Sequence, residues 1–112
     1  MNALAMQETA APIGPTPTIF EAIVRRRCVT ATYNRTQVVL APHVIFTRHG
    51  EVYVGATTLE RDGQPPREEK LGLFKLDGLV DLAGTDRPFF PSAVFDRNDE
   101  RYAQTALMMV EP

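Results

Sequence analysis

The sequence predicts a mainly β domain, a small five-stranded barrel with one helix before its strands and another after them. Between Tyr33 and Leu79, short apolar runs are separated by turn-forming or charged segments, a pattern typical of an antiparallel meander. Before this meander, apolar residues recur at helical spacing. A helix followed by short, bent strands is the order expected of a half-open barrel with the helix capping one end.

Length and composition restrict the chain to one domain. Its 112 residues, 44% of them hydrophobic, are enough for one core and too few for a second folding unit. The net charge of -2 does not require an anionic partner, although arginines are concentrated in the first half. The sequence has no secretory leader pattern and no apolar run that could span a bilayer, so we expect a cytoplasmic protein without a membrane partner. Its single cysteine, Cys28, excludes an internal disulfide and is expected to be a buried apolar residue.

The first helix is predicted to follow a disordered tail. Residues 1–17 contain three prolines, which interrupt helices. Thr18 and Glu21 have the spacing of a capping box, in which both side chains accept hydrogen bonds from free N–H groups, so we expect the helix to begin at Thr18. Arginines 25–27 are expected in its last turn, where they oppose the negative end of the helix dipole. A phosphate-binding patch is the alternative role for these arginines.

Alternating apolar residues predict five strands after this helix. The second strand is expected to be long and bent, because Pro42 cannot donate to a ladder. The fourth is apolar on both faces, so it is expected to be covered twice, either by barrel closure or by another subunit of a homo-oligomer. The predicted strands are 29–33, 37–47, 52–56, 71–76 and 79–82.

Residues 96–112 are predicted to form a C-terminal amphipathic helix and tail. Tyr102, Ala106, Met109 and Val110 recur at helical spacing, and acidic residues precede them. The methionines could provide an adaptable contact surface, although packing against the barrel is the expected use.

No motif in the sequence predicts catalysis. There is no glycine-rich phosphate loop, no His-Glu-x-x-His helix and no Gly-x-Ser-x-Gly turn. His43 has no second histidine or carboxylate at ligand spacing, so no metal site is predicted. We therefore expect a protein that is not an enzyme and that uses no cofactor.

Five residues form the predicted ligand-binding surface. Aromatic faces can stack on bases, and neighbouring cations can neutralise phosphates, so a surface carrying both residue types could bind a nucleotide or single-stranded nucleic acid. Tyr53 is the central candidate because its strand neighbours Glu51 and Thr57 are polar, which frees it from the core. The candidate set is Tyr53, Lys75, His43, Arg48 and Tyr33.

Most of these residues also have a structural explanation. Tyr33 shares a strand face with apolar residues, so a position in the core with its hydroxyl at the rim is expected. His43 follows a proline at a strand bend, where a hydrogen-bonded surface imidazole is the default. Arg48 lies beside a turn and could simply be solvated, and Lys75 could keep an exposed strand soluble.

A set of apolar, aromatic and turn residues gives the chain a family resemblance. The set is Ile23, Arg27-Cys28-Val29, Tyr33, Pro42-His43, Val52-Tyr53-Val54, Phe74-Lys75-Leu76-Asp77, Leu79, Phe89 and Pro91. In their order and spacing these residues resemble the WYL domain of bacterial transcription regulators, with Val52-Tyr53-Val54 at the Trp-Tyr-Leu run. The resemblance implies an SH3-like or Sm-like barrel over residues 18–95 and a ligand-sensing role in transcription regulation.

The sequence departs from the WYL pattern in two respects. Family members commonly carry arginines around the strand that here contains Gly72 and Gly78, which leaves Lys75 as a single point charge. A DNA-binding helical domain usually precedes the barrel, whereas only the proline-rich tail precedes Thr18 here. We therefore expect a sensor that acts through a partner, such as a DNA-binding regulator. The alternative is a protein-interaction or oligomerisation module without a small ligand.

Overall fold

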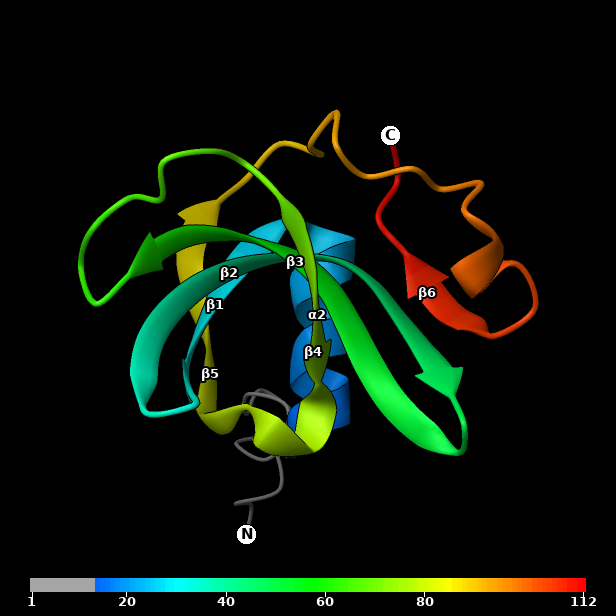
Figure 1. Ribbon diagram of the computed structural model, residues 1–112, viewed down its shortest axis with the longest axis horizontal. Coiled ribbons are helices and arrows are strands. Elements are labelled where there is room, and N and C mark those ends of the chain that lie inside the picture. Colours follow the sequence, from blue (N-terminus) through cyan, green and yellow to red (C-terminus); the bar gives the residue numbers. More distant parts are fainter. Residues whose placement is uncertain (1–13) are drawn as a thin grey trace, which may run out of the picture.

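The computed structural model describes residues 14–112, which form a strongly curved antiparallel sheet and one α-helix (Figure 1). The elements are α2 (Pro15–Arg25), β1 (Arg27–Tyr33), β2 (Thr36–Arg48), β3 (Glu51–Arg61), β4 (Leu71–Lys75), the 3-10 turn η1 (Leu76–Gly78), β5 (Val80–Pro88), the 3-10 turn η2 (Glu100–Tyr102) and β6 (Ala106–Met109). The predicted mainly β class and the first helix are confirmed. Most of the predicted tail lies outside the described residues.

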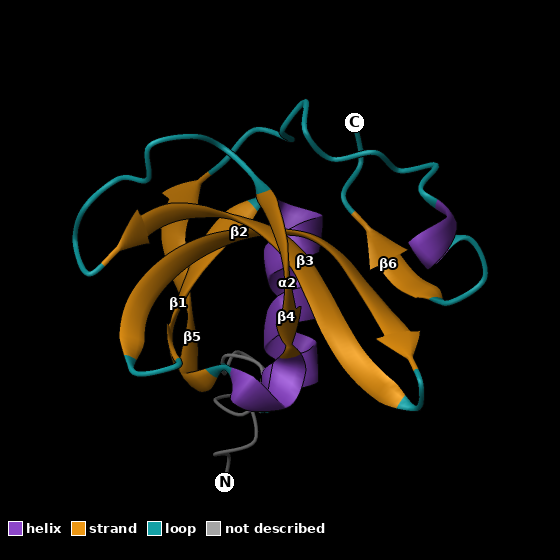
Figure 2. Cartoon of the chain, in the orientation of Figure 1, coloured by secondary structure: helices purple, strands orange, loops and turns teal. Residues whose placement is uncertain are grey.

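Strand β2 is the centre of the sheet. The strand order is β4-β3-β2-β1-β5, and β6 also pairs with β2. The first half of β2 pairs with β1 and the second half with β6, while β3 follows nearly its whole length. Within residues 14–112, no ladder joins β4 to β5, so the sheet is not closed into the predicted barrel. Figure 2 shows the arch of β2 and β3, with α2 behind it.

The predicted bend in β2 occurs at Pro42. The pairing with β3 shifts register between Pro42 and Val44, as expected at a residue that cannot donate to a ladder. On β3, Gly55 pairs with Val44, and a Cβ at Gly55 would lie only 2.7 Å from Val44 Cγ1. A side chain at position 55 would therefore force Val44 to move.

The predicted boundaries of the helix are wrong at both ends. It begins at Pro15. A helix tolerates proline in its first turn, because the N–H groups that proline lacks would have no partner within the helix there. The Thr18 hydroxyl donates to the Gly14 carbonyl oxygen (2.8 Å) instead of capping the helix. At the other end, Arg26 adopts a left-handed conformation (φ 56°) and ends α2, and Arg27 already belongs to β1. Only Arg25 lies in the last turn.

The predicted C-terminal helix is also wrong. Residues 100–102 form a single 3-10 turn, and Ala106–Met109 form β6, which pairs with Val44, Ile45 and Phe46 of β2. The open backbone edge at the second half of β2 offers ladder hydrogen bonds to this segment, and tertiary pairing overrides local helix propensity.

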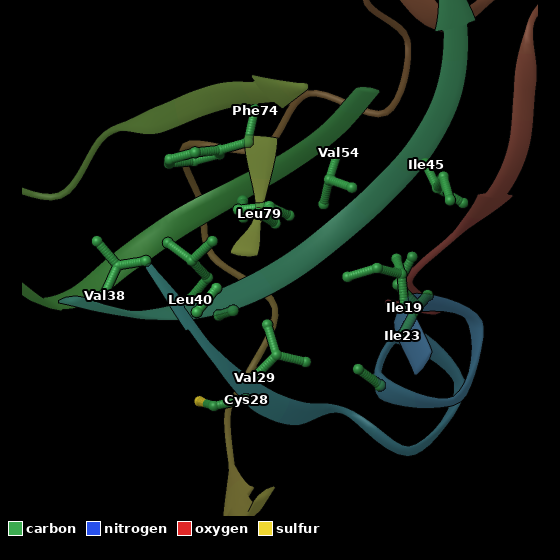
Figure 3. Close-up of a cluster of buried hydrophobic side chains, with 14 of the residues drawn as sticks. Ile19, Ile23, Cys28, Val29, Val38, Leu40, Ile45, Val54, Phe74 and Leu79 are labelled. Atoms are coloured by element: carbon green, nitrogen blue, oxygen red, sulfur yellow. The ribbon is translucent and has the colours of Figure 1, made fainter. Parts of the chain in front are cut away.

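The main core lies between α2 and the inner face of the curved sheet. Figure 3 shows Ile19 and Ile23 of α2 beside a cluster that includes Val29, Leu40 and Val54 from three different strands. All five side chains are at most 1% exposed. Cys28 belongs to the same cluster, as predicted, and burial raises the pKa of its thiol.

Candidate ligand-binding face

Three of the five predicted site residues lie on one face at the end of the β2–β3 hairpin. The hairpin turns through His49 (φ 52°) and Gly50 (φ 78°), and two consecutive residues with positive φ match the twist of the flanking strands. Arg48 pairs with Glu51 across the turn, and Tyr53 pairs with Lys75 of β4. Because side chains alternate along a strand, this register places Arg48, Tyr53 and Lys75 on the same face.

The ring of Tyr53 packs beside the ring of Phe46. The two residues are cross-strand partners, and their rings stack with centroids 5.9 Å apart and an interplanar angle of 27°. Tyr53 is half-buried, whereas Phe46 is fully buried. The tyrosine ring is thus held in place and keeps part of its surface available for stacking.

Lys75 already has an anionic partner. Its Nζ lies 2.9 Å from Glu51 Oε1, and both side chains are nearly half exposed. The hydrogen bond from the ammonium to the Glu51 carboxylate raises the pKa of Lys75, and the charge of that carboxylate adds to the effect. A phosphate that binds Lys75 must therefore displace Glu51 or share the ammonium with it.

The structure excludes Tyr33 from this face. Tyr33 ends β1 and packs edge-on against Phe74, with ring centroids 5.0 Å apart. A Cβ on Gly78 would lie 2.9 Å from Tyr33 Cε1, so the ring fills the space above that glycine. Tyr33 is therefore separate from this face, and it is partly buried and packs against the core, in line with the core interpretation.

His43 is buried, so its interpretation as a surface imidazole is wrong, and it does not belong to this face. Its side chain is 0% exposed and lies between the rings of Phe89 and Phe95. The backbone N–H of Ser92 donates to Nε2 (2.9 Å), and Nδ1 lies 2.8 Å from the Ala41 carbonyl oxygen. These partners require a neutral ring with its proton on Nδ1. Burial lowers the pKa of His43 and favours this neutral form.

Sequence reasoning missed the second apolar cluster beneath the candidate face. Tyr102 packs edge-on against Phe46 (5.0 Å between centroids) and beside Phe95 (5.8 Å), so aromatic rings connect Tyr53 with the environment of His43. The Tyr102 hydroxyl is buried and has no hydrogen-bond partner among residues 14–112. The concentration of aromatic residues after position 88 was the available signal, but it was assigned to a helix and an extended segment.

A hollow of about 540 Å³ lies elsewhere, between α2 and β5. Two ion pairs lie on its walls, Glu21 with Arg25 (3.0 Å) and Arg27 with Asp86 (3.3 Å). The residues that line the hollow include no aromatic side chain, so it offers a base no stacking surface of the kind that Tyr53 provides.

Other observations limit the chemistry of the described residues. Residues 14–112 contain no group of three or more histidine, cysteine, aspartate or glutamate side chains that could hold a metal ion. No helix in this part of the chain has the length and hydrophobicity needed to cross a bilayer.

Comparisons of the chain with protein-family models, curated proteins and solved structures found no match.

Proposed function

We propose that the chain is a regulatory module that binds a nucleotide unit on the face formed by Arg48, Tyr53 and Lys75. The cross-strand pairing of Tyr53 with Lys75 carries this proposal, because it puts a stacking surface beside a cation. The base stacks on the exposed part of the Tyr53 ring, and the phosphate contacts Lys75 and Arg48. The ligand is a free nucleotide or one unit of a single strand.

The resemblance to the WYL domain supports the regulatory part of this proposal. The strand order and the strong curvature of the sheet fit a half-open relative of the small barrel expected for that family. In this proposal the module passes ligand information to a partner protein, such as a DNA-binding regulator.

The first test removes the stacking surface. We expect Tyr53→Ala to weaken binding of a fluorescent single-stranded oligonucleotide or of free nucleotides by about 5- to 150-fold, since one stacked base contributes about 1–3 kcal/mol. Tyr53→Phe keeps the ring and is expected to keep the affinity. Fluorescence anisotropy measures both, with the nucleotide and oligonucleotide arms identifying the ligand. Affinity equal to wild type in Tyr53→Ala would contradict the proposal.

The second test concerns the Lys75–Glu51 ion pair. Because Glu51 competes with the phosphate for Lys75, we expect Glu51→Gln to tighten binding by a factor of about two to five at low salt. Lys75→Ala is expected to reduce the slope of log affinity against log salt by about one. Asp77→Asn removes an acid near Lys75 without an ion pair to it, so a smaller change is expected in this control. Equal effects of Glu51→Gln and Asp77→Asn would argue against direct phosphate contact with Lys75.

A protein-interaction module is the second candidate, and strand β5 favours it. None of its nine residues is buried, and within residues 14–112 it pairs only with β1. The other edge of β5 therefore presents unpaired backbone groups that another strand could use.

A further inference from the structure

Gly84 lies at the middle of β5, between two irregular segments, because the register with β1 shifts between Val80 and Ala83 and again between Gly84 and Pro88. Asp81 and Arg87 lie three positions before and after Gly84, so opposite charges flank the centre at equal spacing. Two exposed apolar side chains lie further out, Val80 (54% exposed) before the centre and Phe90 (91% exposed) after it. At the centre, a Cβ on Gly84 would find no atom of the described residues within 4 Å.

We propose that two copies of this chain pair through their β5 edges, antiparallel, about a two-fold axis at Gly84. This inference rests on the second candidate function and names its partner as a second copy. In this register Asp81 of one copy lies opposite Arg87 of the other, and the contact occurs twice. Val80 faces Pro88 of the other copy, which brings Phe90 near the exposed Val80.

Charge complementarity favours a second copy over an unrelated strand. Edge strands of monomers are usually protected by charged side chains, proline or β-bulges, and the register shifts of β5 leave its centre, around Ala83 and Gly84, as the regular part of the edge. Asp86 of β5 is paired with Arg27, and the other two charges, Asp81 and Arg87, have opposite signs, so an antiparallel copy matches them at both ends. Pro88, which has no N–H, lies at the end of the strand, where it does not interrupt the central ladder.

The surroundings of Arg87 are compatible with this contact. Its guanidinium binds Glu60 on β3 with a distance of 2.6 Å, and Glu60 and Asp81 line the same shallow hollow on the outer face of the sheet. The two-fold axis of this pairing is perpendicular to the sheet, so the outer faces of the two copies lie on the same side of the joined sheet. A guanidinium has five N–H donors and can bind two carboxylates.

A cysteine at the axis tests the register. Two residues directly opposite each other in an antiparallel ladder form either a hydrogen-bonded or a non-hydrogen-bonded pair. In both cases the Cα atoms of the two copies at position 84 lie about 4.5–5.5 Å apart, which a disulfide can span. We expect Gly84→Cys to form a covalent dimer under mild oxidation and Leu107→Cys, an exposed position distant in sequence, to remain largely uncrosslinked. The native Cys28 is 0% exposed and should not contribute.

Charge reversal tests the interface independently. By sedimentation equilibrium we expect Asp81→Arg to raise the dimer dissociation constant at least about tenfold, and Asp81→Arg with Arg87→Asp to restore much of the loss. Glu100→Arg, an exposed change in η2, is the control and should leave the dimer unchanged. If the protein dimerises, but Asp81→Arg does not change the dissociation constant and Gly84→Cys forms no crosslink, this interface is wrong and the interaction function is still supported. A strict monomer with no protein partner would overturn both.

Discussion

Replacing Phe46 with alanine is expected to lower the free energy of unfolding by about 3–5 kcal/mol, a large part of the roughly 5–15 kcal/mol typical of small domains. Phe46 is fully buried, stacks on Tyr53 and packs edge-on against Tyr102. It lies where β2 pairs with β3 on one side and β6 on the other. Its removal therefore leaves a cavity and loosens the attachment of the C-terminal strand.

Urea denaturation followed by circular dichroism measures this loss. Phe90→Ala is the matched control, because it deletes the same side chain from a position that is 91% exposed, and a change within about 0.5 kcal/mol is expected. If both variants lost the same stability, the position of Phe46 in a packed cluster would be contradicted. Phe46→Ala should also weaken nucleotide binding, because Tyr53 loses the ring that supports it.

Acidification below about pH 6.5 is expected to destabilise the protein through His43. The folded protein holds His43 neutral, because burial lowers its pKa below the ordinary value of about 6.5. The unfolded chain therefore binds a proton before the folded protein does. The stabilisation is complete above pH 6.5 and is lost as the pH falls from there towards the folded pKa, by at most about 1.4 kcal/mol per pH unit.

Protonation of Nε2 also turns an acceptor into a donor that faces the Ser92 N–H. The segment around Ser92 should then separate from β2. The measurement is the free energy of unfolding between pH 7.5 and 5.5, a range above the titration of ordinary carboxylates. His43→Gln cannot titrate, so its stability, although lower at pH 7.5, should change less across this range. Parallel profiles for the two proteins would exclude His43 as the source.

The strands could be predicted from the sequence more reliably than the ends of the chain. Alternation marks a strand with one buried face, as in β1, and Pro42 marked the bend of β2. The start of α2 was missed because its prolines were taken as helix breakers, although they lie in the first turn, where they are tolerated. Residues 106–109 favour a helix locally, and only their pairing with β2 makes them a strand.

The candidate site was predictable in composition and not in geometry. Residue types suggested Tyr53 and Lys75, but only the register of β3 with β4 makes them neighbours. His43 shows the limit most clearly, because its decisive partner is the Ser92 N–H, 49 residues away in sequence. A histidine beside a proline gives no local indication of such a contact.

Strand β2 has a thermodynamic consequence, because its two halves serve different surfaces. Residues before the bend pair with β1, which carries β5 and the proposed dimer edge, and residues after it support Tyr53 and the nucleotide face. If a change of conformation at the bend couples the two surfaces, thermodynamic linkage makes the coupling reciprocal. The factor by which bound nucleotide changes the dimerisation constant is then the same factor by which dimerisation changes the nucleotide affinity. Measuring nucleotide affinity for wild type and for Asp81→Arg at one protein concentration would give that factor, and a factor of one would show that the two halves of β2 act independently.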